Sequence, residues 1–279
     1  MNNSIFMRFP NFKRKALTLS YDDGVVFDKK LIEIMDKHGL KGTFNLNSGL
    51  FAERDGEGRL TKEAALALYK DSPHEVAIHG EKHYSLALVD EAVALNDVLA
   101  DRKNLEKMFG RIVKGMAYAN GNFNDNAVEI LKKCGVNYAR TVISTEHFEI
   151  PTDWLRLPAT CHHNNPRLME LAKEFVESEK SWYYWGGTCK LFYLWGHSYE
   201  FNDNNNWEVI EKFASYMGGR EEIWYATNGE IYDYVKAYES LVYSADGMQV
   251  KNPTAIDVYI HFFGKPYVIP AGKVVKLEK

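Results

Sequence analysis

The sequence predicts an α/β fold of the β/α barrel type, and three observations point to it. Short apolar segments alternate with amphipathic helical segments from about residue 16 to about residue 240, an alternation typical of parallel sheets. Side chains suited to catalysis fall at or just after the ends of predicted strands, where a β/α barrel builds its site. No glycine-rich phosphate-binding pattern follows a strand, which disfavours a nucleotide-binding doubly wound sheet.

The predicted elements follow one another in regular order. Strands are expected at residues 16–21, 42–46, 75–79, 115–118, 137–142 and 191–196. Helices are expected at residues 28–38, 61–71, 90–109, 124–134, 166–178, 207–218 and 229–239. Gly39 and Gly135 follow two of these helices, and glycine is the residue that most readily ends a helix in the left-handed conformation.

The end of the sequence has a different pattern. Short strands separated by turns are expected at 250–253, 258–260 and 267–272. No linker, repeat or low-complexity segment precedes them. We therefore expect residues 1–240 to form the barrel and residues 241–279 to form a small C-terminal β extension packed on it.

Composition places the chain among globular proteins. Hydrophobic residues make up 46% and charged residues 26% of its 279 residues, and the net charge is -4. The only basic cluster is the short run at 13–15, so a nucleic-acid groove is not expected. The three cysteines, Cys134, Cys161 and Cys189, are widely spaced and predict no disulfide framework. No signal peptide or membrane-spanning run is evident, which predicts a cytoplasmic protein, and the oligomeric state is left open.

Two adjacent carboxylates, Asp22 and Asp23, end the first predicted strand and precede Gly24. Their charges repel, and each raises the pKa of the other unless a cation or a hydrogen-bond donor compensates. Successive side chains of extended backbone point to opposite sides, so the two acids can take different roles. The alternative is an ordinary acidic turn, because Asp-Asp-Gly is common in turns.

Histidines complete a possible metal site. His79 ends a predicted strand and His83 follows four positions later, so on a helical turn both imidazoles would reach one face. Two imidazoles and one carboxylate suit a divalent metal with open coordination positions. Incidental histidines at a helix start are the alternative. His197 ends another apolar strand and is either a general acid or a hydrogen-bonded core residue.

Taken together, three segments resemble the motifs of NodB-type polysaccharide deacetylases. They are 20–24 (Ser-Tyr-Asp-Asp-Gly), 79–83 (His-Gly-Glu-Lys-His) and 194–197 (Leu-Trp-Gly-His). In the family the corresponding motifs are Thr-Phe-Asp-Asp-Gly, His-Ser/Thr-x-x-His and Leu-x-x-His. Their order and rough spacing agree, and the resemblance runs from about residue 16 to about residue 230.

The resemblance implies a distorted (β/α)7 TIM-like barrel that removes acetyl groups from N-acetylated sugars. It assigns Asp23, His79 and His83 to one divalent ion, with zinc as the first choice and cobalt as another. It also makes Asp22 the general base and His197 the general acid. The implied partner is an N-acetylated carbohydrate or a small amide, with no nucleic acid or membrane.

The middle motifs depart from the family pattern. Where relatives carry Arg-x-Pro-Tyr, this chain has Ala-Tyr-Ala-Asn-Gly at 117–121. The arginine that steadies the catalytic aspartate is therefore missing from its usual place. We hypothesise that Arg140, at a strand end on the same barrel face, replaces it, with Arg156 as the second candidate. Asn120 would still offer a backbone N–H to an oxyanion.

Aromatic residues make up 14% of the chain. Trp154, Trp195 and the segment 182–185 would suit the flat faces of sugar rings, although core packing explains most aromatic residues. Trp154 belongs to a fragment of the family's fourth motif. His162 and His163 follow a short apolar segment. They either line the substrate pocket from a loop or belong to a plain loop, and the plain loop is the favoured interpretation.

Two other functions remain open from the sequence. One is hydrolysis of cyclic amides or ureides within the same fold, in some cases without metal. The other is a non-catalytic carbohydrate-binding barrel that keeps the aromatic residues. Binding alone does not need an unshared second carboxylate, so the full set of acids and histidines argues against the last.

Overall fold

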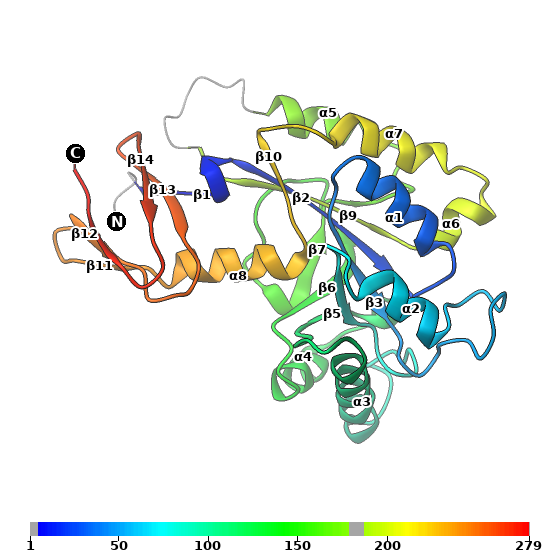
Figure 1. The fold of residues 1–279 in the computed structure, drawn as a ribbon. Coiled ribbons are helices and arrows are strands. Elements are labelled where there is room, and N and C mark those ends of the chain that lie inside the picture. Colours follow the sequence, from blue (N-terminus) through cyan, green and yellow to red (C-terminus); the bar gives the residue numbers. More distant parts are fainter. Residues whose placement is uncertain (1–4, 179–186, 279) are drawn as a thin grey trace.

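Parallel strands form the centre of the molecule (Figure 1). The structure is a computed structural model that describes residues 5–178 and 187–278, so the aromatic segment 182–185 lies outside it. The strands of the central sheet are β2 (Lys15–Asp22), β3 (Gly42–Leu46), β4 (Glu75–Ile78), β5 (Gly115–Ala117), β6 (Tyr138–Ser144), β7 (Leu157–Ala159), β8 (Cys161–His162), β9 (Lys190–Gly196) and β10 (Ile223–Tyr225).

The sheet curls into a barrel. Its strand order is β7-β6-β5-β4-β3-β2-β9-β8, and β10 pairs with the first half of β2. β7 pairs with β6, whereas β8 pairs with β9. Since β7 and β8 are separated by one residue, Thr160, this segment joins the two ends of the sheet. The predicted distorted (β/α)7 barrel is thereby confirmed.

Helices cover the outside of the barrel. They are α1 (Asp28–Lys37), α2 (Lys62–Tyr69), α3 (Glu91–Phe109), α4 (Asp125–Lys133), α5 (Leu168–Glu177), α6 (Ser198–Asp203), α7 (Glu208–Met217) and α8 (Asn228–Glu239). All but α6 were predicted. Thr61 caps α2, because its hydroxyl accepts from the N–H of Ala64. Among the described helices, none combines the length and the apolar character needed to cross a membrane.

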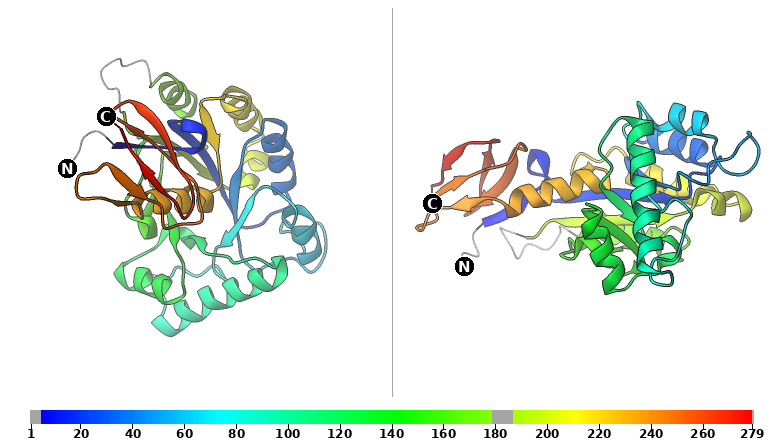
Figure 2. Two further views of the ribbon diagram at one scale, coloured as in Figure 1. Left: turned by 60° about the vertical axis from the view of Figure 1, so that its left-hand side comes forward. Right: turned by 90° about the horizontal axis from the view of Figure 1, so that it is seen from below.

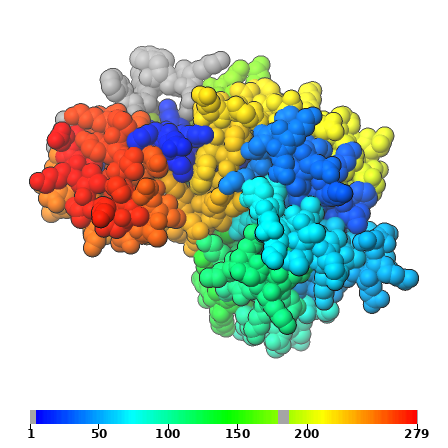
Figure 3. Space-filling model, viewed as in Figure 1, coloured from blue at the N-terminus to red at the C-terminus, as the bar shows by residue number. Residues whose placement is uncertain are grey.

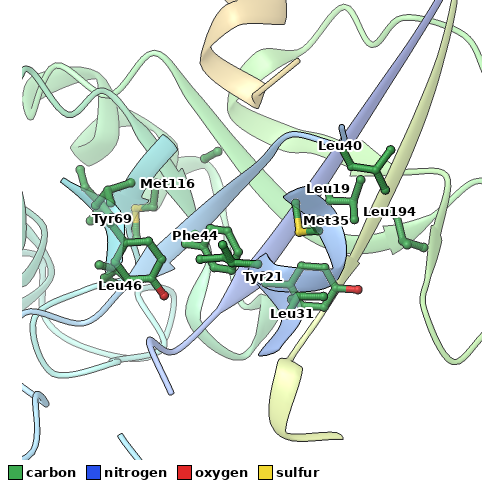
Figure 4. Close-up of a cluster of buried hydrophobic side chains, with 14 of the residues drawn as sticks. Leu19, Tyr21, Leu31, Met35, Leu40, Phe44, Leu46, Tyr69, Met116 and Leu194 are labelled. Carbon is green, nitrogen blue, oxygen red and sulfur yellow. The ribbon is translucent and has the colours of Figure 1, made fainter. Parts of the chain in front are cut away.

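Alternation along β2 sorts its side chains into two environments. Leu17, Leu19 and Tyr21 belong to the apolar core between the sheet and the helices, as Figure 4 shows for the last two. Ser20 and Asp22 alternate with them and are also buried. Because period-two alternation places them on the opposite face, they point into the barrel. The interior is therefore polar where the first carboxylate lies.

The N-terminus of α8 fills the barrel interior near the N-terminal ends of β3 and β4. The side chain of Asn228 accepts from the hydroxyl of Thr18 at 2.8 Å and donates to that of Tyr193 at 2.6 Å. The backbone N–H groups of Asn228 and Gly229 donate to Thr43 Oγ1 and Glu75 Oε2. A carboxylate at a helix N-terminus also complements the helix dipole.

The C-terminal part forms two small antiparallel sheets, and the first strand of the chain joins one of them. β11 (Val242–Tyr243), β12 (Gln249–Lys251) and β15 (Val274–Lys276) form one sheet. β13 (Val258–Phe262) and β14 (Lys265–Ile269) form another together with β1 (Ile5–Arg8). β1 therefore pairs with a strand of the C-terminal part and not with the central sheet. Too short to show a periodicity, β1 gave no sequence signal.

Figures 2 and 3 show this C-terminal extension at one side of the barrel, and the ribbon in Figure 2 shows α8 leading to it. Tyr234 of α8 connects the parts, because its hydroxyl donates to the carbonyl of Arg8 and accepts from the N–H of Tyr259. The extension lies away from the barrel end that carries Asp22 and Asp23.

Candidate active site and metal centre

The two carboxylates at the end of β2 face different neighbours. Asp22 is 2% exposed and points into the barrel. Asp23 has a φ of 84°, a left-handed conformation that is uncommon outside glycine, and its N–H donates to the carbonyl of Asn45 at 2.9 Å. The turn therefore directs the second carboxylate outward, toward the loop after β4.

Asp23, His79 and His83 converge. The distance from Asp23 Oδ1 is 3.9 Å to Nε2 of His79 and 3.6 Å to Nε2 of His83. These atoms lie within 4.8 Å of one another. Atoms bound to one metal at about 2.0–2.2 Å lie roughly 3–4 Å apart, so the spacing fits a shared ion. Arg59 also donates to Asp23 Oδ1 at 3.1 Å.

Hydrogen bonds prepare His79 for a metal. Its Nδ1 lies 2.9 Å from the carbonyl oxygen of Ala117, which can only accept. The proton is therefore on Nδ1, and the lone pair of Nε2 faces Asp23. This N₂O donor set fits a divalent ion of the zinc type.

The histidines are not on a helical turn, so that part of the prediction was wrong. His83 has a φ of 58° and lies in a loop without helix. α3 fixes this loop from behind: Asp101 accepts the N–H of His79 at 3.0 Å, and Asp97 accepts that of Lys82 at 2.7 Å. Two helix side chains four residues apart thus position both imidazoles.

Arg140 pairs with Asp22. Its Nη2 donates to Asp22 Oδ2, while the side-chain amide of Asn45 donates to Oδ1 at 2.8 Å. Burial alone would raise the pKa of Asp22, but the Arg140 guanidinium, with His79 and His197 nearby, lowers it to about 2. The carboxylate is therefore ionised and held at both oxygens.

The other arginine candidate does not reach this carboxylate. Arg156 forms surface ion pairs with Asp125 and Asp153. Arg140 lies within β6, level with Ala117 at the end of β5, whereas Arg156 lies in the short 3-10 helix before β7.

His197 lies across from Asp22, just beyond the end of β9. Its Nε2 is 3.8 Å from Asp22 Oδ2, and its Nδ1 is 3.3 Å from Oε2 of Glu200. Burial lowers the pKa of His197, but Glu200 and Asp22 together outweigh burial and raise it. A histidine near two carboxylates is suited to hold a proton at neutral pH.

The other predicted residues differ in position. Trp195 is 8% exposed and stacks under Arg140, whose guanidinium lies 4.3 Å from its ring centroid. Asn120 lies on the loop after β5 and donates to the hydroxyl of Ser85 in the loop of the histidines. Trp154 is not at this site: it is buried edge-on against Tyr232 of α8. Its aromatic area packs the core and leaves no face for a sugar.

Several residues of the site were missed from the sequence. Glu200, His162 and His163 gather beside His197, and the favoured interpretation of the two adjacent histidines as a plain loop was wrong. Asn45 and Arg59 contact the two aspartates. The three-residue spacing of His197 and Glu200, typical of a capping box, was a usable signal.

Comparison with known proteins agrees with these motifs. Residues 10–139 match the family model described as Polysaccharide deacetylase. The match includes Asp22, Asp23, His79 and His83. Over residues 10–139 the chain is similar to the polysaccharide deacetylase family. No curated protein matches it.

Several solved structures align with this chain, one of them with a TM-score above 0.5. A putative polysaccharide deacetylase from Mycobacterium smegmatis aligns with a TM-score of 0.61 and 17% identity, over 83% of this chain and 93% of that one. A Streptococcus pyogenes deacetylase in complex with acetate aligns with a TM-score of 0.45 and 19% identity, over 50% of this chain and 62% of that one. A Bacillus anthracis pseudoenzyme of the CE4 family has a TM-score of 0.48 and 17% identity, over 82% and 68%.

Proposed function

We propose that this protein is a metal-dependent hydrolase that removes acetyl groups from N-acetylated carbohydrates. The observation that carries the proposal is the convergence of Asp23, His79 and His83 beside an ionised carboxylate and a histidine. Similarity to the polysaccharide deacetylase family supports an acetylated carbohydrate as the substrate class.

Asp23, His79 and His83 would hold one divalent ion, and their N₂O donor set favours zinc. Such an ion supplies a Lewis acid for the acetyl carbonyl and for water. Asp22 is left outside this set, because Arg140 and Asn45 occupy its oxygens. A carboxylate held in this way keeps its charge and its orientation.

In the proposed reaction, Asp22 accepts a proton from the water that attacks the acetyl carbonyl carbon. The new bond joins the water oxygen to that carbon, and the bond between the carbon and the sugar nitrogen breaks. His197 gives a proton to the departing nitrogen, so that it leaves as a neutral amine. The products are acetate and a free amino sugar.

Substrate contacts would come from the same barrel end. The backbone N–H of Asn120 would donate to the developing oxyanion. Trp195 would act through Arg140, because its ring lies against the guanidinium. Trp154 is withdrawn from the substrate-binding set because it is buried elsewhere.

Acetate release tests this function. Purified protein would be stripped with a chelator, loaded with zinc or cobalt, and given N-acetylglucosamine and its oligomers. We expect equal amounts of acetate and free amine only from the loaded protein, and little product from a His197→Ala variant.

Two outcomes would contradict the proposal. Cleavage of cyclic amides or ureides by the stripped protein would favour the metal-independent alternative. Sugar binding without acetate release under every metal condition would favour a non-catalytic barrel.

A further inference from the structure

Beside the metal centre, three imidazoles surround one carboxylate. The Glu200 cluster consists of Glu200, His162, His163 and His197. Oε2 of Glu200 lies 3.1 Å from Nε2 of His162, 3.2 Å from Nε2 of His163 and 3.3 Å from Nδ1 of His197. The members come from β8, the turn after it, and the junction of β9 with α6.

The start of α6 fixes Glu200 next to His197. The N–H of His197 donates to Oε2 of Glu200 at 3.1 Å, and the N–H of Glu200 donates to the carbonyl of His197 at 3.2 Å. This is the N3 position of a capping box, in which the side chain reaches back to the first residue. The carboxylate is therefore tied to the backbone of the residue whose ring it contacts.

Proton positions follow from the hydrogen bonds. Nδ1 of His162 accepts from the N–H of Asn164 at 3.1 Å, so in the neutral ring the proton is on Nε2 and faces Glu200. A carboxylate can only accept, so the Nδ1 of His197 that faces Glu200 must also carry a proton. The remaining nitrogen of His197, Nε2, is directed toward Asp22.

The negative charge of the cluster lies on Glu200, beside the partly buried imidazoles of His162 and His197. Burial would raise the pKa of Glu200, but the three histidines hold it well below its usual range. His163 is 1% exposed and packs against Phe201, and burial lowers its pKa to about 4. His163 is therefore neutral, and the negative charge of Glu200 acts on His197 and His162.

We propose that Glu200 is a positioning residue for the acid step: it orients His197 and stabilises its imidazolium form, so that Nε2 presents a proton to the leaving nitrogen. This inference rests on the proposed function and deepens it. Glu200 touches no reacting atom and acts only through His197.

Other groups also face His197. Asp22 and Asp23 approach it from the end of β2, and Tyr199 of α6 stacks near it at 5.1 Å between ring centroids. His162 lies 6.3 Å away from the side of β8. Since Asp22 remains when Glu200 is neutralised, we expect a partial loss of the proton on His197 and not a complete one.

Glu200→Gln is the test variant, because glutamine keeps the cap and removes the charge. Glu230→Gln is its matched control, since Glu230 also reaches back as the N3 residue of a capping box, that of Thr227. Rates of acetate release would be measured between pH 5 and 10 for both variants. Imidazole signals of His197 would be followed by NMR in the metal-free proteins.

For Glu200→Gln we expect kcat at neutral pH to fall about tenfold, less than the roughly 100- to 10,000-fold that a general acid contributes. The alkaline limb of the pH profile should move to lower pH, because His197 must stay protonated to act as the acid. The NMR titration of His197 should move in the same direction. Glu230→Gln should leave the profile and the titration unchanged.

Equal profiles and equal His197 titrations in Glu200→Gln and the wild type would overturn the inference while leaving the deacetylase function intact. The inference would also be overturned if the wild type bound two metal ions per chain and Glu200→Gln bound one, because the cluster would then be a second metal site. A wild type that releases no acetate would instead refute the proposed function, and the NMR result alone would then decide the positioning role.

Discussion

Two clusters of histidines and a carboxylate lie at the same end of this barrel, and they are built for opposite charges. One contains Asp23, His79 and His83, and the other contains Glu200 with its histidines. In each cluster the side-chain nitrogens approach a carboxylate oxygen within 4 Å. Residue type and spacing therefore do not distinguish them.

Backbone hydrogen bonds distinguish the clusters. The carbonyl oxygen of Ala117 accepts a hydrogen bond from Nδ1–H of His79, so Nε2 keeps its lone pair for a cation. An N–H group at Asn164 occupies the lone pair of Nδ1 in His162, which leaves a proton for an anion. The backbone group bonded to Nδ1 thus decides whether Nε2 of the histidine can bind a metal or donate a hydrogen bond.

Removing one imidazole from each cluster gives the largest expected contrast. His79→Ala should lose the bound ion and nearly all acetate release, beyond the roughly 10- to 100-fold cost of losing an outer partner. His162→Ala should keep the ion. Metal content per chain after dialysis measures both, and loss of the ion from His162→Ala would show that the clusters are not distinct.

Next in size is the effect of separating Asp22 from its arginine. Arg140→Met leaves a buried carboxylate unpaired, so the free energy of unfolding should fall by about 3–5 kcal/mol at pH 7. Arg156→Met removes only surface pairs and should cost at most about 1 kcal/mol. Denaturant unfolding of both variants measures the difference, and equal costs would contradict the buried pair.

The pH dependence of the same pair has a definite sign. Burial would raise the pKa of Asp22, but Arg140, together with His79 and His197, lowers it from 3.8 to about 2. The ionised carboxylate therefore stabilises the fold fully above pH 3.8, and this stabilisation is lost as the pH falls through 2. In Arg140→Met the pKa of Asp22 should rise, since its burial remains. Stability should then be lost at a higher pH than in the wild type.

The pH dependence of stability that Asp28 contributes should have the opposite sign. Burial raises the pKa of Asp28 from 3.8 to about 7, against hydrogen bonds from Ser198, Tyr69 and Val25. Its contribution to stability is complete below 3.8 and is lost as the pH rises through 7. Asp28→Asn should remove this loss, which is about 3 kcal/mol between pH 4 and 7 for a shift of that size.

Asp125→Asn is the control for Asp28→Asn, because the side chain of Asp125 is 96% exposed. Thermal unfolding at several pH values measures both. An unchanged slope in Asp28→Asn would mean that Asp28 is ionised in the folded protein across this range.

The smallest predicted effect concerns the ring between the clusters. Trp195 contacts Arg140 on one side and His162 on the other. Trp195→Phe should weaken the guanidinium contact by about 1 kcal/mol. A double-mutant cycle with Arg140→Met isolates this coupling, and Trp224→Phe, a ring packed against Phe9, gives the comparison. A coupling of zero would contradict the contact.

Much of the fold could be predicted because its signals are local. The apolar alternation of β2 and the glycines after helices follow from short-range rules. Asp22 and Asp23 could be separated in role for the same reason, since neighbouring side chains on a strand diverge. The pairing of Arg140 with Asp22 could be predicted because residues near the C-terminal ends of parallel strands face the same end of a barrel.

Other features depend on contacts between segments that are far apart in the sequence, and short-range sequence patterns do not reveal such contacts. The loop geometry at His83 depends on Asp97 and Asp101 of α3. Trp154 was misplaced because an aromatic residue has the same type in a core as in a sugar site. Glu200 was missed because its contacts with His162 and His163 depend on the pairing of β8 with β9.

The left-handed backbone at Asp23 and His83 has an evolutionary consequence. In the proposed metal site each position must supply both a ligand atom and this backbone conformation, so most substitutions there would fail on both counts. Asparagine is the exception at position 23, because it takes this conformation readily and matches aspartate in size. A single step to asparagine would keep the turn and remove the charge, which is the shortest route from an enzyme of this family to an inactive descendant with an intact fold.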